Sequence, residues 1–153
     1  MIFADQESKL LYEYYDPEKM KDIDLLISCG DLPPEYLTFF ATLCHAPLLY
    51  VQGNHDSKYE YKPPEGCIWI DEDLYGYKGV RSLGLGGSME YRPDSPNQYT
   101  GRKMRARIRR LWWKLWRHKG FDILGAHAPA YKLNDMEDLP HRGFKAFLDL
   151  MDK

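Results

Sequence analysis

Apolar residues in this chain follow two patterns: short continuous runs, and longer stretches in which they recur every three or four positions. The runs have the length of buried strands and end on polar residues, so we expect strands at residues 1–4, 24–29, 47–51 and 121–126. The spaced stretches predict helices at residues 33–43, 100–118 and 139–152. Strands that alternate with helices in this way predict an α/β fold.

Residues 66–87 follow a different pattern, in which three short strand-like pieces are separated by Asp and Gly. The pieces, at residues 67–70, 74–77 and 80–85, predict a hairpin or meander. Combined with the strand–helix–strand units, they predict mixed sheets. The last predicted helix has no strand after it, although a crossover helix in an α/β sheet is normally followed by one.

Composition and charge fit one globular domain over residues 1–153, because no repeat, low-complexity tract or linker divides the chain. Hydrophobic residues make up 44% of the sequence, and the net charge of -2 gives no global attraction to nucleic acid or an anionic membrane. No stretch resembles a secretion signal or a membrane span, so we expect a cytoplasmic protein without a membrane partner. Three widely spaced cysteines argue against disulfides and against a C-x-x-C zinc site.

Residues that can bind metals follow four of the predicted strands. In chain order they are Asp5; Asp31; Asn54, His55 and Asp56; and His127. We expect them to converge, because open α/β sheets bind ligands beyond the carboxyl ends of their strands. Carboxylate, amide and imidazole groups suit manganese, iron or zinc. Each residue alone also fits a turn or a structural hydrogen bond, and only the conjunction favours a metal site.

At these motifs the sequence resembles the calcineurin-like metallophosphoesterases. Gly30-Asp31-Leu-Pro-Pro-Glu35 and Gly53-Asn54-His55-Asp56 correspond to the second and third strand-end motifs of that superfamily, and Gly125-Ala-His127-Ala-Pro129 resembles a later one. The resemblance covers nearly the whole chain. It implies a layered αββα sandwich with mixed sheets and helices on both outer faces.

Two motifs depart from the family pattern. The first reads Asp5-Gln6-Glu7, with a glutamate where the family has histidine, so that Glu7 either offers an oxygen ligand or leaves the metal without that contact. The last motif, G-H-x-H, has no counterpart, and the sequence stops where its strand would begin. We therefore expect a C-terminally incomplete member that lacks its last strands and binds metal more weakly.

The resemblance implies a phosphoesterase that binds two divalent transition-metal ions, manganese, iron or zinc. Asp31 would bridge the ions, Asp5 would bind the first, and Asn54 with His127 would bind the second. A hydroxide bridging both ions would attack a phosphomonoester or phosphodiester, so the expected partner is a phosphorylated small molecule or nucleotide.

The resemblance also assigns roles around the reacting phosphate. His55 would stabilise the transition state or protonate the leaving oxygen, and Asp56 would orient the His55 ring. Residues 82–88 are rich in glycine but lack the ending of a P-loop, so they predict a sharply turning strand. Such a turn lies near the metals in this family, which makes Arg92 a candidate ligand for the substrate phosphate. We assign no chemistry to His141, which precedes the apolar part of the last predicted helix.

Residues 102–119 contain nine Lys or Arg and no acidic residue. Apolar residues fall on one stripe of the predicted helix, which favours a core-facing helix with a solvated basic face; they are Met104, Ile108, Leu111, Trp112, Leu115 and Trp116. Alternatively, the basic face binds an anionic partner such as RNA, DNA or polyphosphate, with Trp113 available for stacking. The contrasting function is then a non-catalytic scaffold that binds such a partner.

Overall fold

The predicted strand–helix–strand segments form the first of two main sheets. In the computed structural model, which describes residues 1–152, four parallel strands follow the chain order: β1 (Ile2–Phe3), β2 (Leu26–Ser28), β3 (Leu48–Tyr50) and β4 (Ile68–Trp69). All residues of β2 and β3 are buried, as expected for parallel strands covered on both faces. Helix α3 (Pro34–Leu43) buries Tyr36, Leu37 and Phe40 against this sheet.

The second sheet is mixed and has the order β5-β6-β9. Strands β5 (Leu74–Tyr77) and β6 (Val80–Leu85) form the predicted antiparallel hairpin, and β9 (Ile123–Ala126) lies parallel to β6. A further parallel pair joins β7 (Ser88–Met89) to β8 (Gln98–Tyr99). A small hydrophobic cluster consists of Leu49, Val51 and Ile70, and its partly buried neighbours include Tyr75 of β5. Because Leu49 belongs to β3, this cluster contains residues of both sheets.

The predicted meander is wrong for residues 67–70. Strand β4 pairs in parallel with β3, with Ile68 opposite Leu49, and so belongs to the first sheet. The physical reason is the burial of Ile70, which packs against Leu49 and Val51 and is only 1% exposed. That contact pairs the segment with β3, and the residues that follow it bridge to Gly84 of β6.

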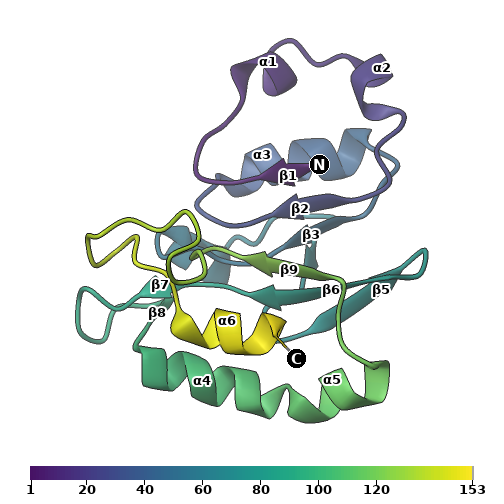
Figure 1. Cartoon of the computed structure of the whole chain (residues 1–153). Coiled ribbons are helices and arrows are strands. Elements are labelled where there is room, and N and C mark those ends of the chain that lie inside the picture. The colour runs from purple at the N-terminus through teal and green to yellow at the C-terminus, as the bar shows by residue number, and fades with distance from the viewer. Residues whose placement is uncertain (153) are drawn as a thin grey trace.

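Helices cover both outer faces of the sheet pair, which confirms the predicted α/β architecture (Figure 1). On the side of the first sheet lie α3 and two one-turn helices, α1 (Lys9–Tyr12) and α2 (Pro17–Met20), which the sequence pattern did not predict. On the side of the second sheet lie α4 (Gly101–Arg110), α5 (Trp112–His118) and α6 (Lys145–Met151). Within residues 1–152, no helix is long and apolar enough to cross a membrane.

The predicted helix at residues 100–118 is two helices that meet at Leu111. The Leu111 N–H donates to the Ile108 carbonyl, three residues back, and this tighter turn changes the phase of the residues that follow. Met104 and Leu111 are buried as predicted, whereas Trp112 and Trp116 are 64% and 62% exposed. Placing these two tryptophans on the core-facing stripe was therefore wrong.

The last predicted helix begins later than expected, because residues 139–144 are not helical. Phe144 is extended and forms an isolated parallel bridge with Ala130, so the chain first returns to the loop after β9. Phe144 and Phe147 are then buried in the core of the second sheet, which fixes α6 against α4. The loop between β9 and α6 is consequently long, and it reaches the carboxyl ends of the strands.

Candidate metal centre

The carboxyl ends of β1, β2, β3 and β9 meet at one edge of the sheet pair, as the sequence pattern predicts. Asp5, Asp31 and His127 each place one ligand atom within 4.8 Å of the others. His127 Nε2 lies 3.0 Å from Asn54 Oδ1 and 3.6 Å from Asp31 Oδ2. Four residues from four separate strand ends thus share one small volume.

Two of these residues have backbone conformations that are uncommon for side chains other than glycine. The φ angle is 59° at Asp5 and 58° at Asp31, in the left-handed region. Such conformations cost on the order of 1–3 kcal/mol and concentrate at functional sites. The Asp5 N–H donates to the Gly30 carbonyl at 3.1 Å, which ties the first strand end to the second.

Gly30 and Gly53 allow two of the loops to cross at contact distance. Gly30 has a φ of 101°, and a Cβ there would overlap the Gly53 backbone. A Cβ on Gly53 would overlap the Asp31 carboxylate and lie 2.8 Å from Cε1 of His127. Gly30 therefore makes room for the backbone of the second loop, and Gly53 makes room for the Asp31 and His127 side chains.

Asp56 fastens the same two loops together. Its Oδ2 accepts hydrogen bonds from the N–H groups of Gly53 and Asp31, both at 2.8 Å, and the residue is 1% exposed. Burial raises the pKa of the Asp56 carboxyl group, and the two backbone donors oppose that rise. Asp31 is held in turn, because its Oδ1 accepts from the His55 N–H at 2.9 Å.

This geometry corrects the role expected of Asp56. The His55 side chain is exposed, and its ring has no hydrogen-bond partner within residues 1–152, so Asp56 does not orient it. Asp56 begins the short 3-10 helix η1 (Asp56–Glu60), and its buried carboxylate binds the two loops while His55 is exposed. Asp56 therefore has a structural role, because it holds the two loops together next to the candidate ligands.

The hydrogen bonds of His127 turn one ring nitrogen toward the other candidate ligands. Its Nδ1 lies 2.8 Å from the Cys29 carbonyl, which can only accept, so Nδ1 carries a hydrogen. Nε2 faces the oxygens of Asn54 and Asp31. Imidazole nitrogen, amide oxygen and carboxylate oxygen are donor types that bind divalent transition metals, and the Cys29 carbonyl orients the ring as an outer partner normally does.

A cavity of about 410 Å³ opens above these ligands. Five residues named from the sequence line it: Asp5, Asp31, Asn54, His55 and His127. Sequence reasoning missed the other polar residues of its wall, which are Ser88, Tyr91, Asn134 and His141. Glu7 lines an adjoining depression with Asp5, Asp31, His55 and Lys58, so it faces the site without joining the Asp5, Asp31 and His127 group.

Tyr91 occupies the place expected of Arg92. The Asn54 side-chain amide donates to Tyr91 Oη at 3.2 Å, which orients the Asn54 oxygen toward His127. Arg92 is exposed outside the cavity wall, and its guanidinium lies 5.7 Å from the centre of the Tyr91 ring. A role for Arg92 in substrate binding stays a prediction.

His141 belongs to the wall although its sequence position indicated no chemistry. Its Nδ1 lies 2.6 Å from Asp138 Oδ2, and both residues sit on the long loop between β9 and α6. No local pattern marks this histidine, because only the return of the loop over the strand ends brings it to the cavity. A histidine–carboxylate pair three residues apart is too common a surface feature to have identified it.

Comparisons with known proteins agree with the strand-end motifs. The search of curated proteins gave no match. The family model for calcineurin-like phosphoesterases matches residues 5–152, nearly the whole chain and every residue of the candidate centre. Members of this family typically bind divalent metals, in keeping with the Asp5, Asp31 and His127 group. The chain therefore belongs to the calcineurin-like phosphoesterase family.

Proposed function

We propose that this chain is a metal-dependent phosphoesterase that hydrolyses phosphomonoesters or phosphodiesters of small molecules or nucleotides. The observation that carries the proposal is the convergence of the Asp31 and Asn54 oxygens on Nε2 of His127, whose other nitrogen is held by the Cys29 carbonyl. A second support is the solvent-open cavity above them, whose volume suits a small ligand.

The ligand side chains can hold two divalent ions of the manganese, iron or zinc class. Asp5 would contribute to one ion, Asn54 and His127 to the other, and Asp31 to both. When bound, such ions lower the pKa of a water molecule and neutralise negative charge on phosphoryl oxygens. The backbone donor of His55 leaves one oxygen of Asp31 hydrogen-bonded and fixes the angle of its carboxylate.

His55 would act on the leaving group. It is exposed and lines both the cavity and the adjoining depression, so a phosphate ester above the ligands would bring its leaving oxygen toward this imidazole. The ring can then donate a proton to that oxygen as the ester bond breaks. His141 presents a second imidazole on the wall, paired with Asp138, and can donate a hydrogen bond to the organic part of the substrate.

The test is hydrolysis of phenyl phosphate and bis-p-nitrophenyl phosphate with added manganese. We expect turnover by the wild-type chain, and a fall in kcat on phenyl phosphate of about 10²- to 10⁴-fold in His55→Ala, because its poorer leaving group depends on a general acid, which contributes that much. Metal content should be unchanged in that variant and reduced in Asp31→Asn. His118→Ala, an exposed histidine at the end of α5, is the matched control.

Two measurements on the same samples separate the outcomes. Elemental analysis should find two manganese ions per chain at saturation. A wild-type chain that binds manganese but turns over no faster than His55→Ala would contradict the proposal. A chain that binds no manganese at saturation would favour the alternative, a non-catalytic scaffold.

A further inference from the structure

The basic segment formed by α4 and α5 carries three stripes of side chains along its length. The first packs against the core of the second sheet and consists of Met104, Ile108, Leu111 and Leu115. The second is cationic and consists of Lys103, Arg107, Arg110 and Lys114. The third, which we call the Arg–Trp stripe, consists of Arg102, Arg105, Arg109, Trp112, Trp113 and Trp116.

The cationic stripe is neutralised within the molecule. Lys103 pairs with Glu90 at 2.9 Å, and the other three side chains bind the acidic turn at residues 71–73 that follows β4. Arg107 is 4% exposed at its side chain and pairs with both Asp71 and Glu72. All four cations of this stripe therefore already have acidic partners within the molecule.

The Arg–Trp stripe is different, because within residues 1–152 none of its three arginines forms an ion pair. Its tryptophans are more than half exposed: Trp112 by 64%, Trp113 by 56% and Trp116 by 62%. The rings of Trp113 and Trp116 stack with centroids 4.9 Å apart and an angle of 28° between planes. Exposing three neighbouring indoles is costly in water and indicates a binding surface.

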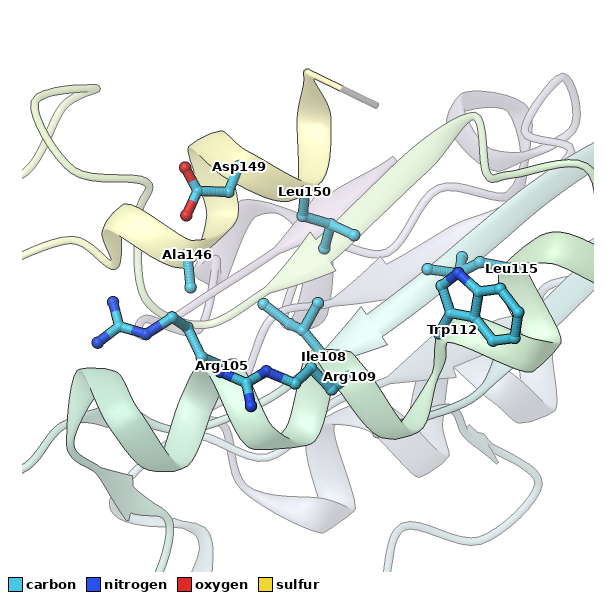
Figure 2. Close-up of a pocket in the computed structure, with 8 residues that line it drawn as sticks. All are labelled: Arg105, Ile108, Arg109, Trp112, Leu115, Ala146, Asp149 and Leu150. Carbon is cyan, nitrogen blue, oxygen red and sulfur yellow. The ribbon is translucent and has the colours of Figure 1, made fainter.

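A groove of about 400 Å³ runs beside the stripe, between α4, α5 and α6 (Figure 2). Arg105 and Arg109 extend from α4 along one side, and Asp149 of α6 lies on the other side. Apolar side chains line it between them, namely Ile108, Leu115, Ala146 and Leu150, and Trp112 is part of its lining. The groove therefore joins a cationic rim to an apolar interior.

We propose that the Arg–Trp stripe and this groove bind single-stranded nucleic acid, a function separate from phosphoester hydrolysis. Guanidinium groups bind phosphates, and exposed aromatic rings stack on bases regardless of sequence. A base entering the groove would meet an apolar lining, and the Asp149 carboxylate can accept a hydrogen bond from an amino group of that base. Arginine and tryptophan also suit an anionic membrane, but a flat bilayer surface would leave the groove unfilled and would bring lipid phosphates toward Asp149.

The test is binding of a fluorescein-labelled oligodeoxycytidylate of about 16 nucleotides, whose bases carry amino groups, followed by fluorescence anisotropy at low salt. EDTA is present throughout, so cleavage at the metal centre cannot interfere and the result does not depend on phosphoesterase activity. We expect binding that weakens steeply as salt rises, because arginine–phosphate contacts release counterions. Three of the four tryptophans of the chain lie in the stripe, so intrinsic fluorescence should be quenched on binding.

Two double variants locate the surface. Arg105→Glu with Arg109→Glu, and Trp113→Ala with Trp116→Ala, should each weaken binding by about tenfold or more. The matched control is Lys9→Glu with Lys19→Glu, which changes the net charge equally on the opposite helix layer. Circular dichroism verifies that all variants are folded.

Three results would overturn the proposal. One is no oligonucleotide binding by the wild-type chain at low salt. Another is equal binding by the Arg105/Arg109 variant and the Lys9/Lys19 control. The third is binding to phosphatidylserine vesicles without binding to the oligonucleotide, which would assign the surface to a membrane.

Discussion

At the scale of single residues, the candidate centre depends on a buried carboxylate that binds backbone N–H groups. Asp56 is buried and joins the loop of Gly53 to the loop of Asp31 through two backbone hydrogen bonds. An ionised carboxylate is a stronger acceptor than a neutral group, and both donors would otherwise be left without a partner. The position of Asp31 among the ligands thus depends on Asp56.

Replacing Asp56 should therefore loosen both the fold and the metal site. For Asp56→Ala we expect a loss of about 2–3 kcal/mol in the free energy of unfolding, measured with urea, because two backbone donors lose a charged acceptor. Manganese affinity should fall by about 10- to 100-fold. Asp56→Asn keeps one acceptor oxygen in the same place and should lose clearly less. If the alanine variant is as stable as the asparagine variant, the Asp56 hydrogen bonds contribute nothing to the free energy of unfolding.

At the scale of elements, Arg107 connects α4 to the second sheet. It binds Asp71 through both carboxylate oxygens, Glu72 through one, and the Gly86 carbonyl, and its guanidinium lies 4.1 Å from the centre of the Tyr99 ring. The pKa of Glu72 is lowered, because hydrogen bonds from Arg107 and Arg110 outweigh the effect of its burial. These contacts need the planar guanidinium group, because its three nitrogens each donate to a different partner.

Removing that connection should destabilise the molecule strongly. We expect Arg107→Ala to cost about 3–5 kcal/mol of unfolding free energy, because it leaves the partly buried Asp71 carboxylate without its cation. Arg107→Lys should recover little, since one ammonium cannot replace the three nitrogens that bind Asp71, Glu72 and the Gly86 carbonyl. Arg109→Ala, an exposed neighbour on the same helix, should change stability by less than about 0.5 kcal/mol. A lysine variant as stable as wild type would contradict this account.

At the scale of the whole molecule, paired carboxylates set the response to acid. Hydrogen bonds from Arg81 hold the pKa of Asp122 at about 2, against an ordinary value of 3.8. Arg81 also donates to the carbonyls of His118 and Lys119, so this pair closes the connection from α5 to β9. The unfolded chain binds more protons than the folded chain wherever the folded pKa is lowered, so stability rises with pH across that interval.

We therefore expect the free energy of unfolding to fall as the pH falls below about 4.5, through the range of ordinary carboxyl groups. The share from Asp122 is fully present above pH 3.8 and is lost as the pH falls through about 2. Asp56 acts in the opposite direction, because burial raises its pKa. Urea unfolding at several pH values should show a shallower acid dependence for Asp122→Asn below pH 3.8. Identical slopes for the variant and wild type would rule out this contribution.

The sequence by itself determined the α/β class, the position of α3, the β5–β6 hairpin and the convergence at the strand ends. Asp5, Asp31, Asn54 and His127 could be named in advance for a physical reason. Parallel strands bring their carboxyl ends to one edge of the sheet. A local pattern of apolar runs followed by polar residues therefore specifies which polar side chains lie close together. Their role as ligands stays a prediction that metal analysis can test.

Tertiary structure alone decided the features that depend on residues far apart in the chain. The acidic turn at residues 71–73 selects which cations of the basic segment are neutralised, and Arg107 lies 36 positions from Asp71. The return of the loop after β9 brings His141 into the cavity wall. Burial against the sheet assigns Asp56 to the backbone instead of to His55. Hydrophobic spacing reports which face of an element is buried, whereas the partner across that face is chosen by packing of the whole chain.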